Sequence, residues 1–285
     1  MSKFQDSELV LNKDGSVYHL NLKPQHIAEN VLIVGDPSRV YRISKHFDKI
    51  EFEMNKREFI THVGRYKGKK ITVLSTGMGP DNIEIFFTEL DALVNVDLKK
   101  KEVKAKKSQL NIIRIGTSGA MQEDIPVGSH VASRFGVGLD NLMDFYEFKH
   151  KPFESEVASH IQQHAKLKFT PYVAEGSAQL LEQFSEGMII GNTVTTPGFY
   201  APQGRRIRLG LKYPKLLRDL SSFHHNDFWL TNFEMETSAL YAMARLLGHN
   251  MLSVNAVIAN RVKGTFSKNP YPTIDSLIKK VLDRL

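Results

Sequence analysis

The chain has no cysteine among its 285 residues, which excludes disulfides and thiolate metal sites. This absence fits a reducing compartment, and we expect the protein in the cytoplasm. No apolar run approaches the ~20 residues that a membrane-spanning helix needs. The first residues lack an apolar segment behind a basic start, so we expect no secretory signal and no membrane partner.

Several nucleotide-binding and catalytic motifs are also missing. The sequence contains no Gly-x-Gly-x-x-Gly opening a helix after a strand, no Walker loop, no Gly-x-Ser-x-Gly elbow and no His-Glu-x-x-His. The eleven histidines show no metal-ligand spacing, so the sequence predicts no metal site.

Charge is unbalanced, with a formal net charge of +7. Such a charge attracts nucleic acid, an anionic surface or small anionic substrates. Much of the excess lies in one run between positions 99 and 107, formed by Lys99, Lys100, Lys101, Lys104, Lys106 and Lys107. No aromatic residue is interleaved for base stacking. A solvated loop is therefore favoured over nucleic-acid contact.

Strand-like and helix-like segments alternate along the chain. Short apolar runs predict strands, and apolar residues at helical spacing predict helices. The strand candidates are 31–35, 58–63, 70–75, 111–116, 129–133, 188–191 and 251–259, with a hairpin at 66–68. The helix candidates are a helix capped by Asp81, then 154–165, 236–247 and 274–285. With no linker or repeat, the pattern predicts one α/β domain over residues 1–285 with a mixed central sheet flanked by helices.

Two strand ends carry glycine beside arginine. Gly35 lets backbone approach a ligand that Arg39 also reaches, although a plain strand-to-helix turn has the same pattern. Arg114 lies inside an apolar strand, where its charge must be met. A bound anion, helped by the hydroxyl of Thr117, or an internal acid would meet it equally well.

Two further segments carry polar groups suited to a nucleoside. Phe233–Glu236 opens a predicted helix, so one carboxylate can accept ribose hydroxyls, or both can complement the helix dipole. Phe199–Arg205 offers an aromatic ring, a carboxamide and a guanidinium. These groups suit a flat heterocycle, or they belong to an exposed polar loop.

Taken in order, these segments resemble the uridine phosphorylase branch of the nucleoside phosphorylase family, from about Tyr18 to the last helix. The markers of the resemblance are Tyr18–Leu20, Gly35–Arg39, Arg57–Phe59, Ser75–Gly79, Arg114–Gly119, Phe199–Arg205, Phe233–Glu236 and Asn260–Arg261.

The resemblance implies a partly barrel-like sheet, as in the phosphorylase/hydrolase fold, and a role for each matching residue. Phosphate would contact Gly35, Arg39, Arg57, Arg114 and Thr117. Ribose would contact His19, Met235 and Glu236. The base would contact Phe199, Gln203, Arg205 and Arg261, the last standing where purine-specific relatives place an aspartate. Among these, the resemblance assigns the catalytic role to Arg114, Glu236 and Arg205.

The same resemblance implies a homodimer or hexamer in which Arg57 and His19 serve the neighbouring subunit's site. It implies no organic cofactor, with inorganic phosphate as co-substrate, and a possible monovalent cation near Glu58. Three features depart from the family: Pro202 replaces a usual glycine, 99–109 is longer than expected, and Gly79–Asn82 differs from the glycine-rich version.

Phosphorolysis of uridine is thus the expected activity, because a uracil anion held by arginine leaves without full protonation. Purine nucleoside phosphorolysis and nucleoside hydrolysis on the same fold stay open. A non-catalytic anion- or RNA-binding protein using the basic face is a more distant alternative.

Overall fold

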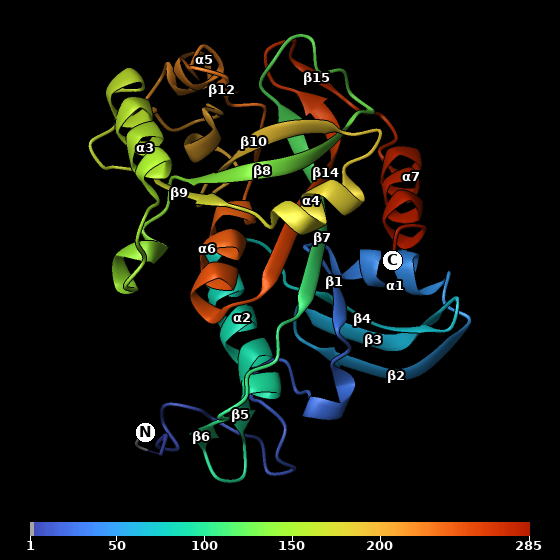
Figure 1. Cartoon of the computed structure of the whole chain (residues 1–285). Coiled ribbons are helices and arrows are strands. Elements are labelled where there is room, and N and C mark those ends of the chain that lie inside the picture. The colour runs from blue at the N-terminus through green and yellow to red at the C-terminus, as the bar shows by residue number, and fades with distance from the viewer. Residues whose placement is uncertain (1–2) are drawn as a thin grey trace. The chain divides into compact units, whose positions relative to one another are not determined.

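The computed structural model describes residues 3–285 and divides the chain into two compact units (Figure 1). The first unit contains the chain up to Ile113 together with Leu247–Asn250. The second unit contains Arg114–Leu246 and Met251–Leu285. Within the described residues, every helix is too short or too polar to cross a membrane.

The first unit carries a four-stranded arrangement in the order β1-β4-β3-β2. These strands are β1 (Asn30–Val34), β2 (Lys49–Lys56), β3 (Phe59–Tyr66) and β4 (Lys69–Ser75). β1 runs parallel to β4, and the other pairs are antiparallel. Lys67 and Gly68 both have positive φ, which matches the right-handed twist of a two-residue hairpin. The hairpin predicted around 66–68 is therefore confirmed.

The helices of this unit are η1 (Pro24–His26), α1 (Pro37–Ser44) and α2 (Pro80–Asn95). The prediction that Asp81 caps α2 is wrong. Gly79 is the N-cap residue, and Asp81 lies in the first turn. Gly79 has a φ of +98°, which glycine adopts readily because it has no Cβ.

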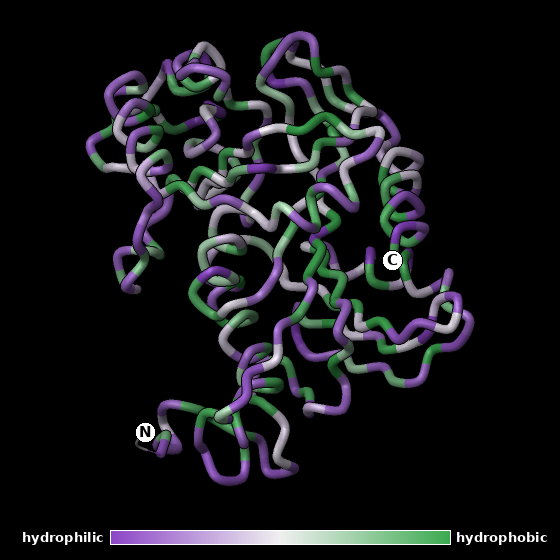
Figure 2. Tube along the Cα trace, in the orientation of Figure 1, coloured by the Kyte–Doolittle hydropathy of each residue, from purple (hydrophilic) through white to green (hydrophobic). Residues whose placement is uncertain are grey.

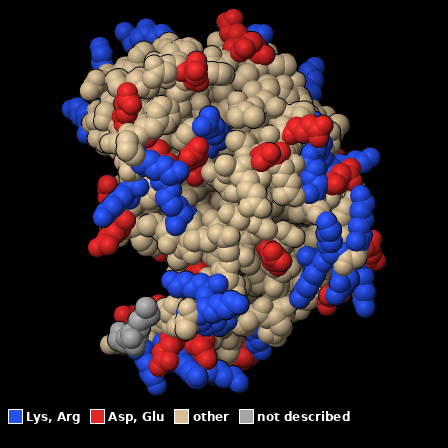
Figure 3. All heavy atoms as spheres, in the orientation of Figure 1, with Lys and Arg blue, Asp and Glu red and all other residues tan. Residues whose placement is uncertain are grey.

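The lysine run is more ordered than a plain loop. β5 (Val96–Asp97) pairs with β6 (Glu102–Val103), and a carboxylate oxygen of Asp97 accepts hydrogen bonds from the backbone N–H groups of Lys99 and Lys100 at 3.1 and 3.0 Å. Figure 3 shows basic side chains gathered at the end that carries β5 and β6, with acidic ones among them. Lys101, for example, is ion-paired with Asp6.

The second unit carries all or most of the residues of the strands β7 (Asn111–Ala120), β8 (His130–Gly138), β9 (Tyr172–Glu175), β10 (Ile189–Thr195), β13 (Asn232–Glu234), β14 (Asn250–Asn260) and β15 (Thr265–Phe266). Their order is β15-β14-β8-β10-β13-β7, and β9 pairs with β8. β14 also pairs with β7, which closes five strands into a ring. β10 is parallel to β8 and β13, whereas β13–β7 and β14–β8 are antiparallel. The predicted α/β class with a mixed, partly barrel-like sheet is confirmed.

Helices cover this ring: α3 (Pro152–His164), α4 (Ala178–Phe184), α5 (Leu216–Ser221), α6 (Thr237–Leu247) and α7 (Tyr271–Leu282), with two short turns, η2 (Leu142–Phe145) and η3 (Ala201–Gln203). In Figure 1, α3 and α5 lie to the left of β8 and β10, and α7 lies to their right. Val157 and Ile161 of α3 join Phe135, Val194 and Phe233 in one buried cluster. Apolar residues recur along α7 at helical spacing, and Figure 2 shows them between hydrophilic ones.

Candidate functional site

Arg114 is the most buried cation among the expected site residues, with 4% of its surface exposed. Its Nη1 donates to Asn255 Oδ1 at 2.8 Å. Its Nη2 is ion-paired with Glu236, and Glu234 Oε2 lies 3.4 Å away. The sequence left a bound anion and an internal acid as two ways to compensate the charge of Arg114. The structure contains internal acids, and there are two of them. The Nε–H group has no partner among the described residues, so one donor remains for a further acceptor.

Gly116 makes this arrangement sterically possible. A Cβ at this position would lie 1.8 Å from Arg114 Nη1 and 2.5 Å from Asn255 Oδ1. The guanidinium therefore folds back over its own strand into the space that glycine leaves. Gly119, three residues further along β7, has a similar role, because a Cβ there would lie 3.1 Å from Cγ of Arg261.

The two glutamates after Phe233 have separate roles. The segment precedes the helix and does not open it, since Glu234 ends β13 and α6 begins at Thr237, one residue after the predicted start. Glu234 accepts hydrogen bonds from the N–H groups of Glu236 and Thr237 at 2.9 Å and from Thr195 Oγ1 at 2.6 Å. It therefore complements the helix amino terminus. Glu236, 3% exposed, is left to pair with Arg114.

The loop after β10 brings three expected base contacts together. The guanidinium of Arg205 lies over the ring of Phe199, 3.7 Å from its centroid, as cation–π attraction favours. Arg205 also donates to the side-chain oxygen of Gln203. Gln203 is buried and donates to Thr196 Oγ1 at 3.0 Å.

Arg261 lies close enough to Arg205 to change its ionisation. Burial, with the positive charge of Arg261 second, lowers the pKa of Arg205 to about 10. Burial also lowers the pKa of Arg261, whose Nη1 has no hydrogen-bond partner among residues 3–285. Neither arginine has a carboxylate partner in the described part of the chain. Two cations held together in this way attract an acceptor-rich ligand.

Pro202 fits the loop without distortion. It stands at the start of η3, where φ near −65° is already required and no N–H is needed. Gly204 ends this turn in the left-handed region, with φ +69°. Gly198 allows the close approach, because a Cβ there would lie 3.1 Å from Cγ of Pro202. The proline thus tightens the turn that presents Gln203 and Arg205.

Thr117 and Met235 are partly exposed, the first on β7 and the second between β13 and α6. Thr117 follows Gly116 on the strand that carries Arg114. Met235 lies between the two glutamates. The second unit therefore holds eight of the expected residues: Arg114, Thr117, Phe199, Gln203, Arg205, Met235, Glu236 and Arg261.

In the first unit, the parallel strands β1 and β4 end at one edge. Gly35 follows β1, and a Cβ there would lie 3.3 Å from the carbonyl oxygen of Gly77, which follows β4. Arg39 lies on α1 and is 7% exposed. Two glycine-containing turns and the helix that carries Arg39 thus belong to one sheet edge, where ligand loops gather in α/β folds.

The remaining expected residues of this unit lie in two further segments. Arg57 is an exposed residue with φ +54°, in the turn between β2 and β3, and Glu58 follows it. His19 is anchored by Glu89 of α2, whose Oε1 lies 2.7 Å from its Nδ1. Glu89 also accepts the backbone N–H of Leu20 at 2.8 Å.

Sequence reasoning missed three of the supporting groups described above. Glu89 was detectable as an acid within an apolar helix segment. Asn255 lies inside a strand, and only the fold reveals that it meets Arg114. The capping role of Glu234 could be predicted only from the correct helix boundary, and the spacing of apolar residues placed that boundary one residue early.

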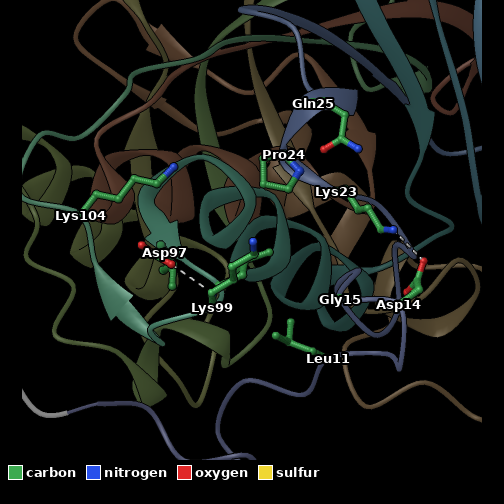
Figure 4. A pocket seen from close by; sticks show the side chains of 11 residues that line it. Leu11, Asp14, Gly15, Lys23, Pro24, Gln25, Asp97, Lys99 and Lys104 are labelled. Carbon is green, nitrogen blue, oxygen red and sulfur yellow. Dashed lines mark hydrogen bonds and ion pairs between the residues drawn. The ribbon is translucent and has the colours of Figure 1, made fainter.

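A cavity of about 550 Å³ lies in the first unit (Figure 4). Its walls include Leu11, Lys23, Asp97 and Lys104. Lys23 is ion-paired with Asp14 at 3.2 Å, and Lys104 donates to the carbonyl of Val94 at 2.8 Å. None of the expected phosphate, ribose or base contacts lines it.

Comparison with known proteins then settles the family. The model of the phosphorylase superfamily matches residues 29–279. This chain belongs to the phosphorylase superfamily. Among similar members, a uridine phosphorylase from Thermococcus kodakarensis is 32% identical over 268 residues, covering 94% of this chain and 86% of the relative. A purine nucleoside phosphorylase from Bacillus thuringiensis is 30% identical over 268 residues, covering 93% and 97%.

A solved superfamily structure is also similar. The Trypanosoma brucei nucleoside phosphorylase, described as showing uridine phosphorylase activity, superposes with a TM-score of 0.89 at 28% identity. The match covers 97% of this chain and 99% of that one. The likeness therefore extends through both units of this superfamily member.

Proposed function

We propose that this chain is a pyrimidine nucleoside phosphorylase, which uses inorganic phosphate to cleave uridine into uracil and ribose 1-phosphate. The observation that carries the proposal is the proximity of two cations, Arg205 and Arg261, together with the contacts that Arg205 makes with Gln203 and Phe199. Two cations without a carboxylate partner favour a base that leaves as an anion. The names of the Thermococcus kodakarensis and Trypanosoma brucei relatives support the same substrate.

In the proposed reaction, a phosphate oxygen bonds to the anomeric carbon as the glycosidic C–N bond breaks. The electron pair of that bond goes to the base, which becomes the uracil anion. Arg205 and Gln203 stabilise this anion through their N–H donors while Phe199 stacks on its ring. Each hydrogen bond that involves a charge contributes about 1.5–3 kcal/mol. The reaction needs no covalent enzyme intermediate, and we propose no organic cofactor.

Glu236, with Met235 beside it, would hold the ribose hydroxyls in this scheme. Arg114 orients the Glu236 carboxylate through their ion pair, and its remaining Nε–H suits an acceptor such as phosphate, with Thr117 adding a hydroxyl. In the first unit, we assign Gly35 and Arg39 to phosphate. Because one family model spans 29–279, we propose that both units form one phosphorylase domain.

We further propose a cytoplasmic homodimer or hexamer, in which Arg57 and His19 serve the neighbouring subunit. The exposure of Arg57 supports such a role, as does the anchoring of His19 by Glu89. A monovalent cation near Glu58 belongs to the same proposal.

Purine phosphorolysis is the nearest competing function, since the Bacillus thuringiensis relative carries that name. Arg261 argues against it, because a purine leaves more readily when an acid protonates it. A hydrolase has no use for the arginines assigned to phosphate. Binding of RNA by the lysine run is disfavoured because Lys101 is ion-paired with Asp6 and Lys104 donates to the carbonyl of Val94.

The test is release of free base from uridine and from inosine, each with and without phosphate. Uracil released only with phosphate supports the proposal. Hypoxanthine under the same condition keeps phosphorolysis but removes Gln203, Arg205 and Arg261 as pyrimidine contacts. Release without phosphate identifies a hydrolase, and no release from either nucleoside contradicts the proposed enzyme activity.

A further inference from the structure

A cluster of metal-binding side chain types lies on the surface of the second unit, outside all the residues assigned above. It consists of Glu156, His160 and His225. One ligand atom from each lies within 4.8 Å of the others. In a tetrahedral zinc site, bond lengths near 2.1 Å place neighbouring ligand atoms about 3.4 Å apart. Small side-chain rotations therefore bring all three onto one ion.

Two of the ligands come from one face of α3. Glu156 and His160 are four residues apart, and helical geometry places such residues one above the other. The Nδ1 atom of His160 lies 2.9 Å from the carbonyl oxygen of Glu156. Because a carbonyl can only accept, Nδ1 carries the proton in this bond. The lone pair is then on Nε2, where a metal binds.

The third ligand comes from the two-stranded hairpin of β11 (His224–His225) and β12 (Phe228–Trp229). Asn226 begins the turn with φ +52°, a conformation that asparagine tolerates. This turn places His225 opposite Phe228. The His225 Nε2 atom lies 3.0 Å from Glu156 Oε1, and the rings of His225 and His160 are stacked with centroids 4.2 Å apart.

Aromatic packing fixes the two elements to each other before any metal binds. Phe153 of α3 and Phe228 of β12 form an edge-to-face pair with centroids 6.0 Å apart. Phe228 is buried in the core of this unit. At the other end of α3, His164 packs edge-to-face on Phe223, which precedes the hairpin. A ligand set held by rigid elements binds metal without a large ordering cost.

We propose that Glu156, His160 and His225 bind one transition-metal dication of the zinc type. Two imidazoles and one carboxylate suit Zn²⁺ and similar ions, whereas Mg²⁺ and Ca²⁺ prefer oxygen ligands only. Three protein ligands leave a fourth position for water. The ion joins α3 to the hairpin that leads into β13. This assignment replaces the expectation of no metal site, because His225 is too far along the sequence for spacing to reveal it.

The experiment titrates the full chain with Zn²⁺ by calorimetry and with Co²⁺ by visible absorption, after treatment with a chelator. One equivalent of Zn²⁺ is expected, together with a Co²⁺ spectrum of four- or five-coordinate type. His160→Ala and Glu156→Gln, both at exposed positions, should weaken binding at least tenfold. The matched control is His224→Ala, an exposed histidine beside the site but outside the ligand set.

His225→Gln provides a second removal of a ligand from a different element. Loss of binding in His160→Ala and His225→Gln, with retention in His224→Ala, supports the site. Circular dichroism checks that each variant keeps the fold. Wild-type affinity in both ligand variants, equal loss in His224→Ala, or no stoichiometric binding by the wild-type chain would overturn it.

Discussion

Arg114 and Glu236 form a buried ion pair that joins β7 to the turn before α6. Both were expected to contact ligands, and the structure makes them contacts of each other. The orientation of the proposed ribose contact therefore depends on the arginine. A neighbouring carboxylate, Glu234, lies within 3.4 Å of the same guanidinium but is committed to the helix amino terminus.

Glu236→Gln should therefore reduce activity more than stability. The amide keeps the shape but loses the charge-assisted bond, worth about 1.5–3 kcal/mol. We expect kcat/KM for uridine to fall about 10- to 100-fold while Glu234 still compensates Arg114. Glu234→Gln should show the opposite balance, because it weakens several helix-capping bonds. Urea denaturation beside steady-state kinetics separates the two, and equal effects in both variants would contradict the assigned roles.

Arg205→Lys should impair base release with little effect on folding. Lysine keeps a charge but loses the planar stacking on Phe199 and the fork that reaches Gln203. A decrease of about tenfold or more in kcat/KM is expected from the loss of one charged hydrogen bond. Arg206→Lys, an exposed neighbour, is the matched control. Equal activity in both variants would remove Arg205 from the base contacts.

Gly116→Ala should destabilise the second unit strongly. The new methyl group would meet Arg114 Nη1 at 1.8 Å and Asn255 Oδ1 at 2.5 Å. Either the guanidinium leaves the carboxylates or the strand shifts, and overpacking of this kind costs about 1–3 kcal/mol. Thermal unfolding measures the loss. Gly210→Ala, where a Cβ meets open space, should leave the melting temperature unchanged. An unchanged melting temperature for Gly116→Ala would mean that Arg114 is not held as described.

Arg57→Gly should keep or raise stability while activity falls. The φ of +54° at Arg57 costs a residue with a Cβ about 1 kcal/mol that glycine does not pay. An arginine at this strained position points to a role outside the fold of its own subunit. Mixing Arg57→Gly with an inactive Arg205 variant tests the proposed exchange across the interface. Recovered activity in mixed oligomers is expected, and full activity of Arg57→Gly alone would exclude the role.

Stability should fall as the pH decreases from 7 to 5. Burial lowers the pKa of His62 and likewise that of three other histidines: His26, His130 and His150. Between these folded values and the ordinary 6.5, the unfolded chain binds more protons, so protonation favours unfolding. The loss begins near the ordinary value and levels off below the folded ones. His62→Asn keeps a group near Ser44 but does not titrate, so its urea midpoint should depend less on pH than that of the wild-type chain.

The spacing of apolar residues predicted most long helices and strands, because burial of one face imposes that spacing on the sequence. The strand at 111–116 and the helix at 154–165 correspond to β7 and α3, with ends that differ by a few residues. The hairpin β11–β12 was missed because its apolar content is two residues long. The closure of β14 onto β7 was equally invisible, since pairing between strands so distant in sequence leaves no local pattern.

Among the site residues, local sequence predicted what lies within one loop. Phe199, Gln203 and Arg205 occur within seven positions and are brought together by η3. The partners of Arg114 could not be chosen from sequence, because an anion and an internal acid satisfy an arginine equally well. Only the three-dimensional structure shows that Glu236 and Asn255 are the partners of this arginine.

The closed ring of five strands separates the Arg114–Glu236 pair from the loop that carries Arg205, and these two parts can change at different rates during evolution. β10 and β13 are neighbours in parallel register, yet residues 196–231 intervene between them. That excursion holds the loop with Arg205, and its ends are fixed by strands that remain paired whatever its length. Insertions and exchanges there leave the register of β10 and β13 unchanged. Lineages can therefore diversify the loop while inheriting the Arg114–Glu236 pair intact.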